Sequence, residues 1–460
     1  MDTFADLVAC EDLLLFVNAA ITATGQREFH STQGEQRLSL EFLHSYIEVN
    51  YPDLYAATLA LDINDHNAAL IIRNLLARPG AGDGALIARR LERMSPPRVY
   101  GLFQRLRRDG VNNRRTRAII RDWLAGRPDL AFDAVKYRTA LKEAVRHAHL
   151  KLPDELATFL FEPRSRSRFG TPILDTWRRA HYEQAALYDL PYTVAEGFAA
   201  RHGIRRELFL ERIASRMTRL ERLRLDNRLE RTRPETDADL AAMPLVRLAS
   251  YALSLPFEQR AARRTELTTA FRTSARRAAA TRAGTWGRVA AVLDDSFSAY
   301  GSAAKRRRPL AVAVGCHFLL EALAGEYRGL WLSGGSDPLM AHPVGPTPLG
   351  QRIIDALETA PDRLVIVSDG WDNAPPGLAN QVLRTWRRRL DPERKVSIVH
   401  LNPVYDAEDF DVRRLAASVP TAGIRDAEDL PALVELAQFA EGRTGLAELR
   451  AHLTERAALR

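Results

Sequence analysis

The chain of 460 residues is long enough for two or more domains with substantial cores. Its composition, 46% hydrophobic and 27% charged, is typical of a soluble globular protein, and no apolar run approaches the roughly 20 residues of a membrane-spanning helix. Its two cysteines, Cys10 and Cys316, are far apart in the sequence and favour a reducing cytoplasm. The net charge of +8 permits a nucleic-acid partner without requiring one.

Apolar residues recur at helical spacing through the first part of the chain, up to about residue 285. Turn-forming segments such as 50–53 and 79–84 separate short helices of about ten to fifteen residues. Short helices that alternate with tight turns are typical of stacked helical pairs, as in HEAT-type solenoids. No sequence period is visible, so this prediction depends on helix lengths and turns alone.

The positive charge is concentrated in residues 86–151, which contain 17 lysines and arginines but 6 aspartates and glutamates. The successive helices predicted there contain few acidic residues at the i,i+4 positions that would neutralise the basic side chains. Two interpretations are open: the solvated face of amphipathic helices, or an electrostatic surface for nucleic acid. The shortage of acidic partners favours the second.

Three short motifs follow one another inside this region. An arginine-rich helix ends in Asp122-Trp123, Val-Lys-Tyr follows at 135–137, and a basic helix ends in His-Leu-Lys at 149–151 before Pro153. The order of these motifs resembles the TROVE module of the Ro autoantigen family. In that family the module is a ring of HEAT-like helical pairs, which holds single-stranded RNA ends in its basic hole and structured non-coding RNA on its outer face. The resemblance implies RNA contacts at Lys136 and His149, with further basic residues on the same helices: Arg114, Arg115, Arg117, Arg121, Arg138, Lys142 and Arg146.

Two alternatives stay open within this match. The segment between Tyr137 and Lys142 is shorter than in the family, so Arg138 either fills a second basic family position or that position is absent. His149 taken alone also fits a histidine that is satisfied within a helical core.

The basic segment 163–170 lies outside this match and fits a phosphate contact and a linker equally well.

From residue 284 onward the pattern changes to strands that alternate with helices. Apolar runs at 289–293, 330–332, 364–367 and 396–401 predict strands. Helices are predicted at 309–324, after Thr347, and at 377–390, 430–440 and 445–456. This alternation predicts a mostly parallel, doubly wound sheet. We therefore expect an all-α helical-repeat domain over residues 1–285 and a C-terminal α/β domain over residues 286–460.

Oxygen-bearing side chains follow two of the predicted strands. The sequence Asp-Asp-Ser-Phe-Ser at 294–298 follows the first strand, and Asp369 follows the strand at 364–367, while Thr347 lies on a turn before a helix. Ligands of open α/β sheets bind at the carboxyl ends of the strands, and Mg²⁺ prefers oxygen donors. The alternative is that these residues are helix caps and turns. The pattern predicts a divalent-cation site with Asp294, Ser296, Ser298, Thr347 and Asp369 as ligands.

This order of donors resembles the metal-ion-dependent adhesion site (MIDAS) of von Willebrand factor A domains. Ala299 stands where many such domains have methionine, a position that is not a ligand. A TROVE module followed by a von Willebrand A domain is the arrangement of the Ro family, so the chain resembles a bacterial Ro-like protein. The resemblance implies a Mg²⁺ ion, or another divalent cation, whose coordination shell is completed by a carboxylate from a partner protein.

The sequence and the resemblance together predict an RNA-binding scaffold, part of a ribonucleoprotein, with no membrane partner. The alternative is an adaptor whose helical repeats bind a protein, for example an ATPase, and no RNA. The chain has no nucleophile elbow, Walker loop or His-Glu-x-x-His motif. We therefore expect a binding protein rather than an enzyme.

Overall fold

The computed structural model describes residues 4–78, 83–218, 221–222, 240–438 and 451. The chain packs into two compact units. Unit 1 comprises residues 1–67 and 239–460, and unit 2 comprises residues 68–238. Within the described ranges, every helix is too short or too polar to cross a membrane.

Unit 1 is built on a five-stranded parallel sheet with the strand order β2-β1-β3-β4-β7. Its strands are β1 (Arg288–Leu293), β2 (Glu326–Trp331), β3 (Arg363–Val367), β4 (Ser397–Asn402) and β7 (Thr421–Gly423). The chain leaves β1 toward β2 and then returns to the other side of β1 to form β3 and β4. The reversal of strand order therefore falls between β1 and β3. The four predicted strands are present, but β7 was missed because three residues, Thr-Ala-Gly, give no apolar or β-branched run.

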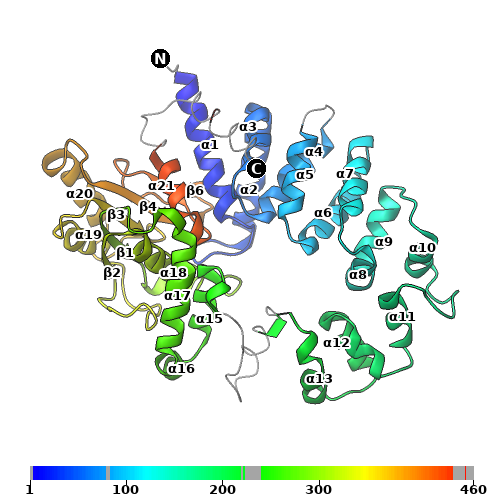
Figure 1. Ribbon diagram of the computed structural model, residues 1–460. Helices are drawn as coiled ribbons and strands as arrows, with labels where there is room; N and C mark the ends of the chain where they lie inside the picture. The colour runs from blue at the N-terminus through cyan, green and yellow to red at the C-terminus, as the bar shows by residue number, and fades with distance from the viewer. Residues whose placement is uncertain (1–3, 79–82, 219–220, 223–239, 439–450, 452–460) are drawn as a thin grey trace. The chain divides into compact units, whose positions relative to one another are not determined.

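Helices cover both faces of this sheet (Figure 1). On one face, α19 (Leu349–Leu357) and α20 (Leu378–Thr385) share a core with β1, β3 and β4. On the other face lies α18 (Arg308–Leu323), which contacts β1, β2 and β3. The helix predicted to reach residue 390 changes after Thr385 to a π-helical turn, Trp386–Leu390. After the sheet, the chain continues through η8 (Ala427–Asp429) to α21 (Leu430–Gln438), and the helix predicted at 445–456 lies outside the described residues.

Helix α18 is apolar around nearly its whole circumference, a pattern typical of an enclosed helix. Two helices that precede the sheet in the sequence, α15 (Leu245–Ser254) and α17 (Arg264–Ala279), pack on its outer side. The rings of Phe271 and Phe318 stack there at 4.4 Å. These helices, with α16 (Phe257–Ala262) between them, therefore share a core with the α/β part.

The N-terminal helices α1 (Phe4–Thr22) and α2 (Gln33–Asn50) also belong to unit 1. The amide of Asn18 on α1 donates to Asp411 at 2.9 Å, and its oxygen accepts the Gly423 N–H of β7 at 2.9 Å. Asp411 lies in β6 (Asp411–Val412), which forms a small antiparallel pair with β5 (Tyr405–Asp406). The two compact units therefore do not coincide with the all-helical part and the strand-containing part of the sequence. The predicted boundary between residues 285 and 286 marks the change to alternating strands and helices, and as a domain boundary it stays a prediction.

Unit 2 is a succession of short helices, each of seven to thirteen residues (Figure 1). They are α4 (Asp65–Ala77), which begins at the boundary with unit 1, α5 (Gly84–Arg93), α6 (Pro96–Arg108), α7 (Arg114–Ala125), α8 (Leu130–Lys136), α9 (Arg138–His147), α10 (Asp154–Phe161), α11 (Pro172–Arg179), α12 (Tyr192–Arg201) and α13 (Arg206–Ile213). Asp133, which is 1% exposed, accepts hydrogen bonds from Arg127 at 2.6 Å and from the Tyr100 hydroxyl at 3.0 Å. The fold class is confirmed: a helical part and a doubly wound α/β domain.

Replacing Asn18 by alanine should destabilise unit 1 by about 2–4 kcal/mol, because Asp411 and the Gly423 N–H each lose a buried partner. Burial already raises the pKa of Asp411, and the Asn18 amide opposes that rise. The loss should therefore be larger at neutral pH than in acid, where Asp411 is protonated in the folded and the unfolded protein. Denaturant unfolding measures the effect, with Asn50→Ala as a control that removes an exposed hydrogen bond to Tyr46. Equal losses in the two variants would contradict it.

Candidate metal site and basic surface

Two carboxylates meet where β1 and β3 end. The strands pair in parallel with Leu293 opposite Val367, and the Asp294 N–H donates to the Val367 carbonyl at 3.0 Å. Asp369 follows Val367 by two residues, and both aspartates are 4% exposed. The two residues therefore lie at the reversal of strand order, where open α/β sheets bind their ligands.

The predicted hydroxyl donors converge on the same place. The Ser296 N–H donates to the Asp294 carboxylate at 2.9 Å, and the Ser296 and Ser298 hydroxyls lie 3.2 Å apart. The turn before Thr347 is bonded to the first loop through the Phe297 N–H and the Gly345 carbonyl, at 3.1 Å. The Thr347 N–H donates to the side chain of Asn373, four residues beyond Asp369, at 2.8 Å. The three predicted stretches are therefore bonded to one another at this edge of the sheet, and their role as one metal site stays a prediction.

The electrostatics of this site fit a divalent cation. Burial, with the neighbouring charge of Asp369 as the second cause, raises the pKa of Asp294 to about 7. His400 on β4 is uncharged near neutral pH and does not compensate the two carboxylates, because burial lowers its pKa to about 4. Two buried carboxylates with three hydroxyls match the oxygen donors that Mg²⁺ prefers. Among the described residues, no group of three or more His, Cys, Asp or Glu side chains is placed to hold a metal ion, so a cation here would depend on the hydroxyl donors as well as on the two carboxylates.

Asp295, inside the same motif, has a different role. It is 2% exposed and accepts hydrogen bonds from the Ser333 N–H at 2.9 Å and from the Ser333 hydroxyl at 2.6 Å. It therefore fastens the loop after β1 to the loop after β2. Of the two adjacent aspartates, Asp295 therefore has a structural role, while Asp294 is the predicted metal ligand.

Sequence reasoning missed the residues that border the site, His30, Trp371 and Asn373. The His30 ring stacks on Trp371 with centroids 4.4 Å apart, and its Nε2 lies 3.8 Å from an Asp369 carboxylate oxygen, too far for a hydrogen bond. Asn373 had a weak sequence signal, since it lies four residues after a predicted ligand. His30 had none, because it reaches the site from the loop between α1 and α2 only through tertiary packing.

That loop is fixed to the segment after the metal-site motif. Glu28, which is 3% exposed, forms an ion pair with Lys305, and the Ser302 hydroxyl donates to the Arg27 carbonyl at 2.6 Å. A buried ion pair positions its segment strongly, because separating the two charges leaves each without compensation. The contact explains why His30 and its neighbours lie beside the aspartates.

Part of the predicted basic surface in unit 2 is free for a ligand. Lys142 and Arg146 on α9 place their cationic groups over the half-exposed ring of Phe161, at 5.4 and 5.1 Å. His149 at the end of α9 is exposed, and Arg114 at the start of α7 is exposed with no ion pair to any described residue. We call Lys142, Arg146, His149 and Phe161 the α9–α10 cluster.

The other predicted residues have hydrogen-bond or ion-pair partners within the protein. The guanidinium of Arg138 donates to the Phe159 and Leu160 carbonyls at 3.1 and 2.9 Å, and burial lowers its pKa, which favours a structural role. Arg115 donates to the Leu75 carbonyl, and Arg117 donates to the side-chain oxygen of Asn112 at 2.9 Å. Arg121 forms an ion pair with Asp122 at 2.8 Å, and Lys136 forms one with Glu221 at 3.9 Å.

His149 occupies a backbone position that favours glycine. Its φ is 53°, its N–H donates to the Arg146 carbonyl at 3.3 Å, and the next N–H, of Leu150, donates to the Val145 carbonyl at 3.0 Å. The same pair of bonds ends α6 at Gly110 and α12 at Gly203, both with positive φ. A histidine in place of glycine costs about 1 kcal/mol. Backbone strain at this exposed residue makes its side chain a candidate for function.

Comparisons with known proteins support the fold that the sequence predicted. The sheet order, the covering helices and the loops that meet at the switch point define a protein with a helical part and a doubly wound α/β part. The chain is similar to the crystal structure of the Ro (RSR) protein of Deinococcus radiodurans, with a TM-score of 0.55 over 94% of this chain and 100% of that chain. The sequence identity is 15%, so the likeness shows a shared fold, that of a bacterial Ro protein. No family model and no curated protein sequence matches the chain.

Replacing His149 by glycine should stabilise unit 2 by about 0.5–1 kcal/mol, because the left-handed backbone conformation is then unstrained. The unfolding midpoint of the variant measures this gain. The reverse exchange, Gly203→His at the equivalent end of α12, should lower the midpoint by a comparable amount. A destabilised His149→Gly protein would show instead that the imidazole holds the fold together.

Replacing Asp294 by asparagine should raise the unfolding temperature in EDTA, because it removes one of two repelling buried carboxylates. The same variant should lose stabilisation by Mg²⁺, which for a bound ion at ten times Kd amounts to about 1.4 kcal/mol. Thermal unfolding with EDTA and with Mg²⁺ measures both effects. The matched control is Asp295→Asn, which weakens the bonds to Ser333 and should lower the unfolding temperature while keeping the response to Mg²⁺. An unchanged Mg²⁺ response in Asp294→Asn would rule out the site.

Proposed function

We propose that the protein is an RNA-binding scaffold of the Ro type, whose HEAT-like helical repeats hold RNA and whose MIDAS-like site binds a protein partner. The observation that carries the RNA part is the α9–α10 cluster, in which the cationic groups of Lys142 and Arg146 lie over the half-exposed ring of Phe161 and the exposed His149 follows Arg146 by three residues. The shared fold with a Ro protein supports this assignment. The proposal concerns binding, and we assign the protein no catalytic reaction.

The chemistry of the cluster suits a single-stranded RNA end. Lys142 and Arg146 would neutralise backbone phosphates, which gives an affinity that depends strongly on salt and little on sequence. The exposed ring of His149 can stack on an unpaired base, because stacking needs only an accessible ring face. Arg114 and Arg117 would add phosphate contacts on α7, since neither is paired with a carboxylate among the described residues. Structured non-coding RNA would contact other exposed basic side chains of residues 86–151.

For the metal site we propose Mg²⁺ held by Asp294, Ser296, Ser298, Thr347 and Asp369. A Mg²⁺ ion there would offer an open coordination position to an acidic side chain of a partner protein. The residues of the chain itself orient these donors: Asp295 fastens the first loop, and Asn373 fixes the turn that contains Thr347. We place the protein in a reducing cytoplasm, since both Cys10 and Cys316 are buried thiols outside any disulfide.

The second candidate function is a protein-binding adaptor without RNA. It is favoured by the ion pairs of Arg121 with Asp122 and of Arg107 with Glu143, which neutralise part of the basic region. An adaptor of this kind would keep the metal site and leave the α9–α10 cluster solvated. Direct RNA binding separates the two functions.

The test is a titration with a hairpin RNA that has a single-stranded 3′ tail, at two salt concentrations. The intact protein should bind more tightly at low salt and need the tail. Arg146→Gln should weaken binding at low salt several-fold and reduce the salt slope by roughly 0.7, the value for one phosphate contact on a single strand. His149→Gly should also weaken binding although it stabilises the fold.

The matched control is Arg179→Gln on α11, which removes an exposed arginine already paired with Glu183 and should leave the affinity unchanged. An equal loss of RNA affinity in the Arg179 and Arg146 variants would show that affinity depends on net charge alone. No binding at low salt would contradict the RNA assignment and leave the adaptor function.

A further inference from the structure

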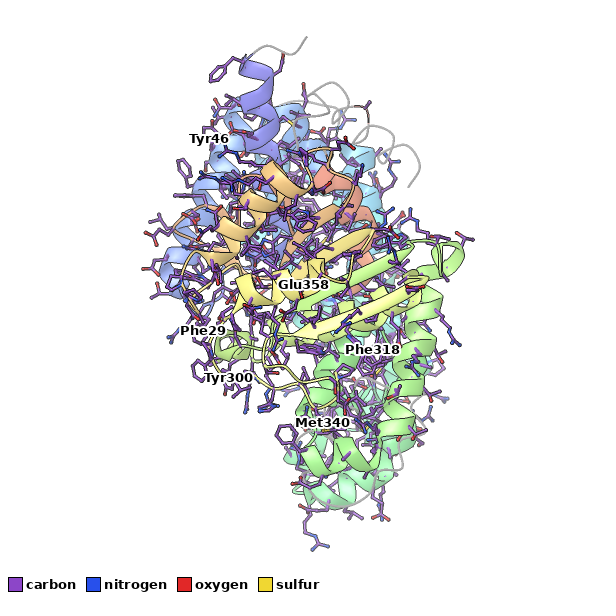
Figure 2. All side chains as sticks on the ribbon, turned by 90° about the vertical axis from the view of Figure 1, so that its left-hand side faces the viewer. Phe29, Tyr46, Tyr300, Phe318, Met340 and Glu358 are labelled. Carbon is purple, nitrogen blue, oxygen red and sulfur yellow. The ribbon has the colours of Figure 1, made fainter. Side chains whose placement is uncertain are left out.

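Exposed aromatic side chains lie within the motif of the proposed metal ligands. Phe297, between Ser296 and Ser298, is 62% exposed, and Tyr300 is 38% exposed. Both belong to the 3-10 helix Phe297–Tyr300, in which residues three apart lie on the same side. Figure 2 shows Tyr300 and Phe29 on one face of unit 1, and the ring of Phe29 meets that of Phe297 edge to face at 5.9 Å.

The aromatic row continues across the site to the second aspartate. Phe29 contacts the ring of its neighbour His30 at 4.8 Å, and His30 stacks on Trp371, two residues after Asp369, at 4.4 Å. The row Tyr300, Phe297, Phe29, His30 and Trp371 therefore draws its members from the loop after β1, the loop between α1 and α2, and the loop after β3. We call these five residues the aromatic rim.

Arginines stand at both ends of the rim. The guanidinium of Arg306 lies over the Tyr300 ring at 5.6 Å, and that of Arg413 lies over the Trp371 ring at 3.7 Å. Arg306 is exposed and forms no ion pair with a described residue, while Arg413 lies 3.7 Å from Asp406. The rim therefore combines apolar surface with positive charge, which complements an acidic segment that also contains an apolar residue.

We propose that the aromatic rim is the docking surface for a protein segment in which an acidic residue stands next to an aromatic or large aliphatic residue. This inference rests on the proposed function, because the acidic residue would take the open position of the Mg²⁺ ion. Its apolar neighbour packs against Phe297, Tyr300 and Phe29. The exposed ring of Phe297, between the two serines of the proposed metal site, has no role in the core of unit 1. Packing against the apolar residue of the docked segment would remove this ring from water.

A protein segment fits this surface better than an RNA base. A base stacks on the free face of a ring, but His30 and Arg413 both already stack on Trp371. Phe29 and Phe297 meet at an interplanar angle of 83°, which presents a ring edge beside a ring face and suits an aliphatic or aromatic side chain.

The experiment selects peptides from a phage-displayed library of random dodecapeptides on the full-length protein in Mg²⁺, with elution by EDTA. The enriched peptides should contain Asp or Glu next to Phe, Tyr, Trp, Leu or Ile. A fluorescent synthetic copy of the most enriched peptide should bind at least tenfold more weakly to Phe297→Ser and should not bind to Asp369→Ala. Leu390→Ser, which removes an apolar side chain 67% exposed elsewhere in unit 1, is the matched control and should bind normally.

Three results would overturn the proposal: enriched peptides without the acidic–apolar pair, undiminished binding to Phe297→Ser, or no Mg²⁺-dependent enrichment by a protein that Mg²⁺ does stabilise. Displacement of the peptide by single-stranded oligouridine at matched affinity would assign the rim to RNA instead. Failure of the metal site itself is recognised separately, since Mg²⁺ would then not raise the unfolding temperature of the intact protein. Phe297→Ser should keep that thermal response, which separates a docking role of the ring from support of the ligands.

Discussion

The parallel pairing of β1 with β3 is the constraint on which the rest of unit 1 depends. It sets Leu293 opposite Val367, so the two strands end level with each other and their following loops leave the sheet side by side. Because strand order reverses at this pair, the crossovers on either side diverge and leave the carboxyl ends of the strands uncovered. Two buried aspartates then lie close enough for the charge of one to raise the pKa of the other. A divalent cation at this position would offset that repulsion, which supports the proposed metal site over helix capping.

The α/β part does not stand alone in this chain. Helix α18 has apolar side chains on every side, so it must be covered by α15 and α17, and the buried Asp411 needs the Asn18 amide of α1. The same packing brings the loop between α1 and α2 to the metal site, where the buried pair of Glu28 and Lys305 holds it. An element that closes the core of unit 1 thereby also borders the proposed metal site, so the N-terminal helices would link core packing to the proposed partner recognition.

Much of this was predictable from local sequence, and the failures have physical causes. Apolar runs and their spacing identified four strands of the sheet, and the oxygen donors at strand ends identified the residues that the fold brings together. Sequence patterns missed the edge strand β7 because it is three residues long and is held in place by its contacts with β4 and Asn18. His30 escaped because its position depends on tertiary packing alone. In the basic helices, the sequence located the charged residues but not the direction of their side chains. Arg138 and His149 both belong to the family-like motifs, yet the Arg138 guanidinium donates to buried carbonyls whereas the His149 side chain is exposed.

The central claim is that single-stranded RNA binds at the end of α9, beside Phe161 and the strained residue His149. The most direct test is photo-crosslinking of a hairpin RNA with a 4-thiouridine-substituted 3′ tail, followed by mass spectrometry of the crosslinked peptides. We expect crosslinks on residues 142–161, with His149 or Phe161 as the modified residue, and their loss when the tail is removed. Crosslinks confined to unit 1, or none under conditions in which the RNA stays intact, would contradict the account.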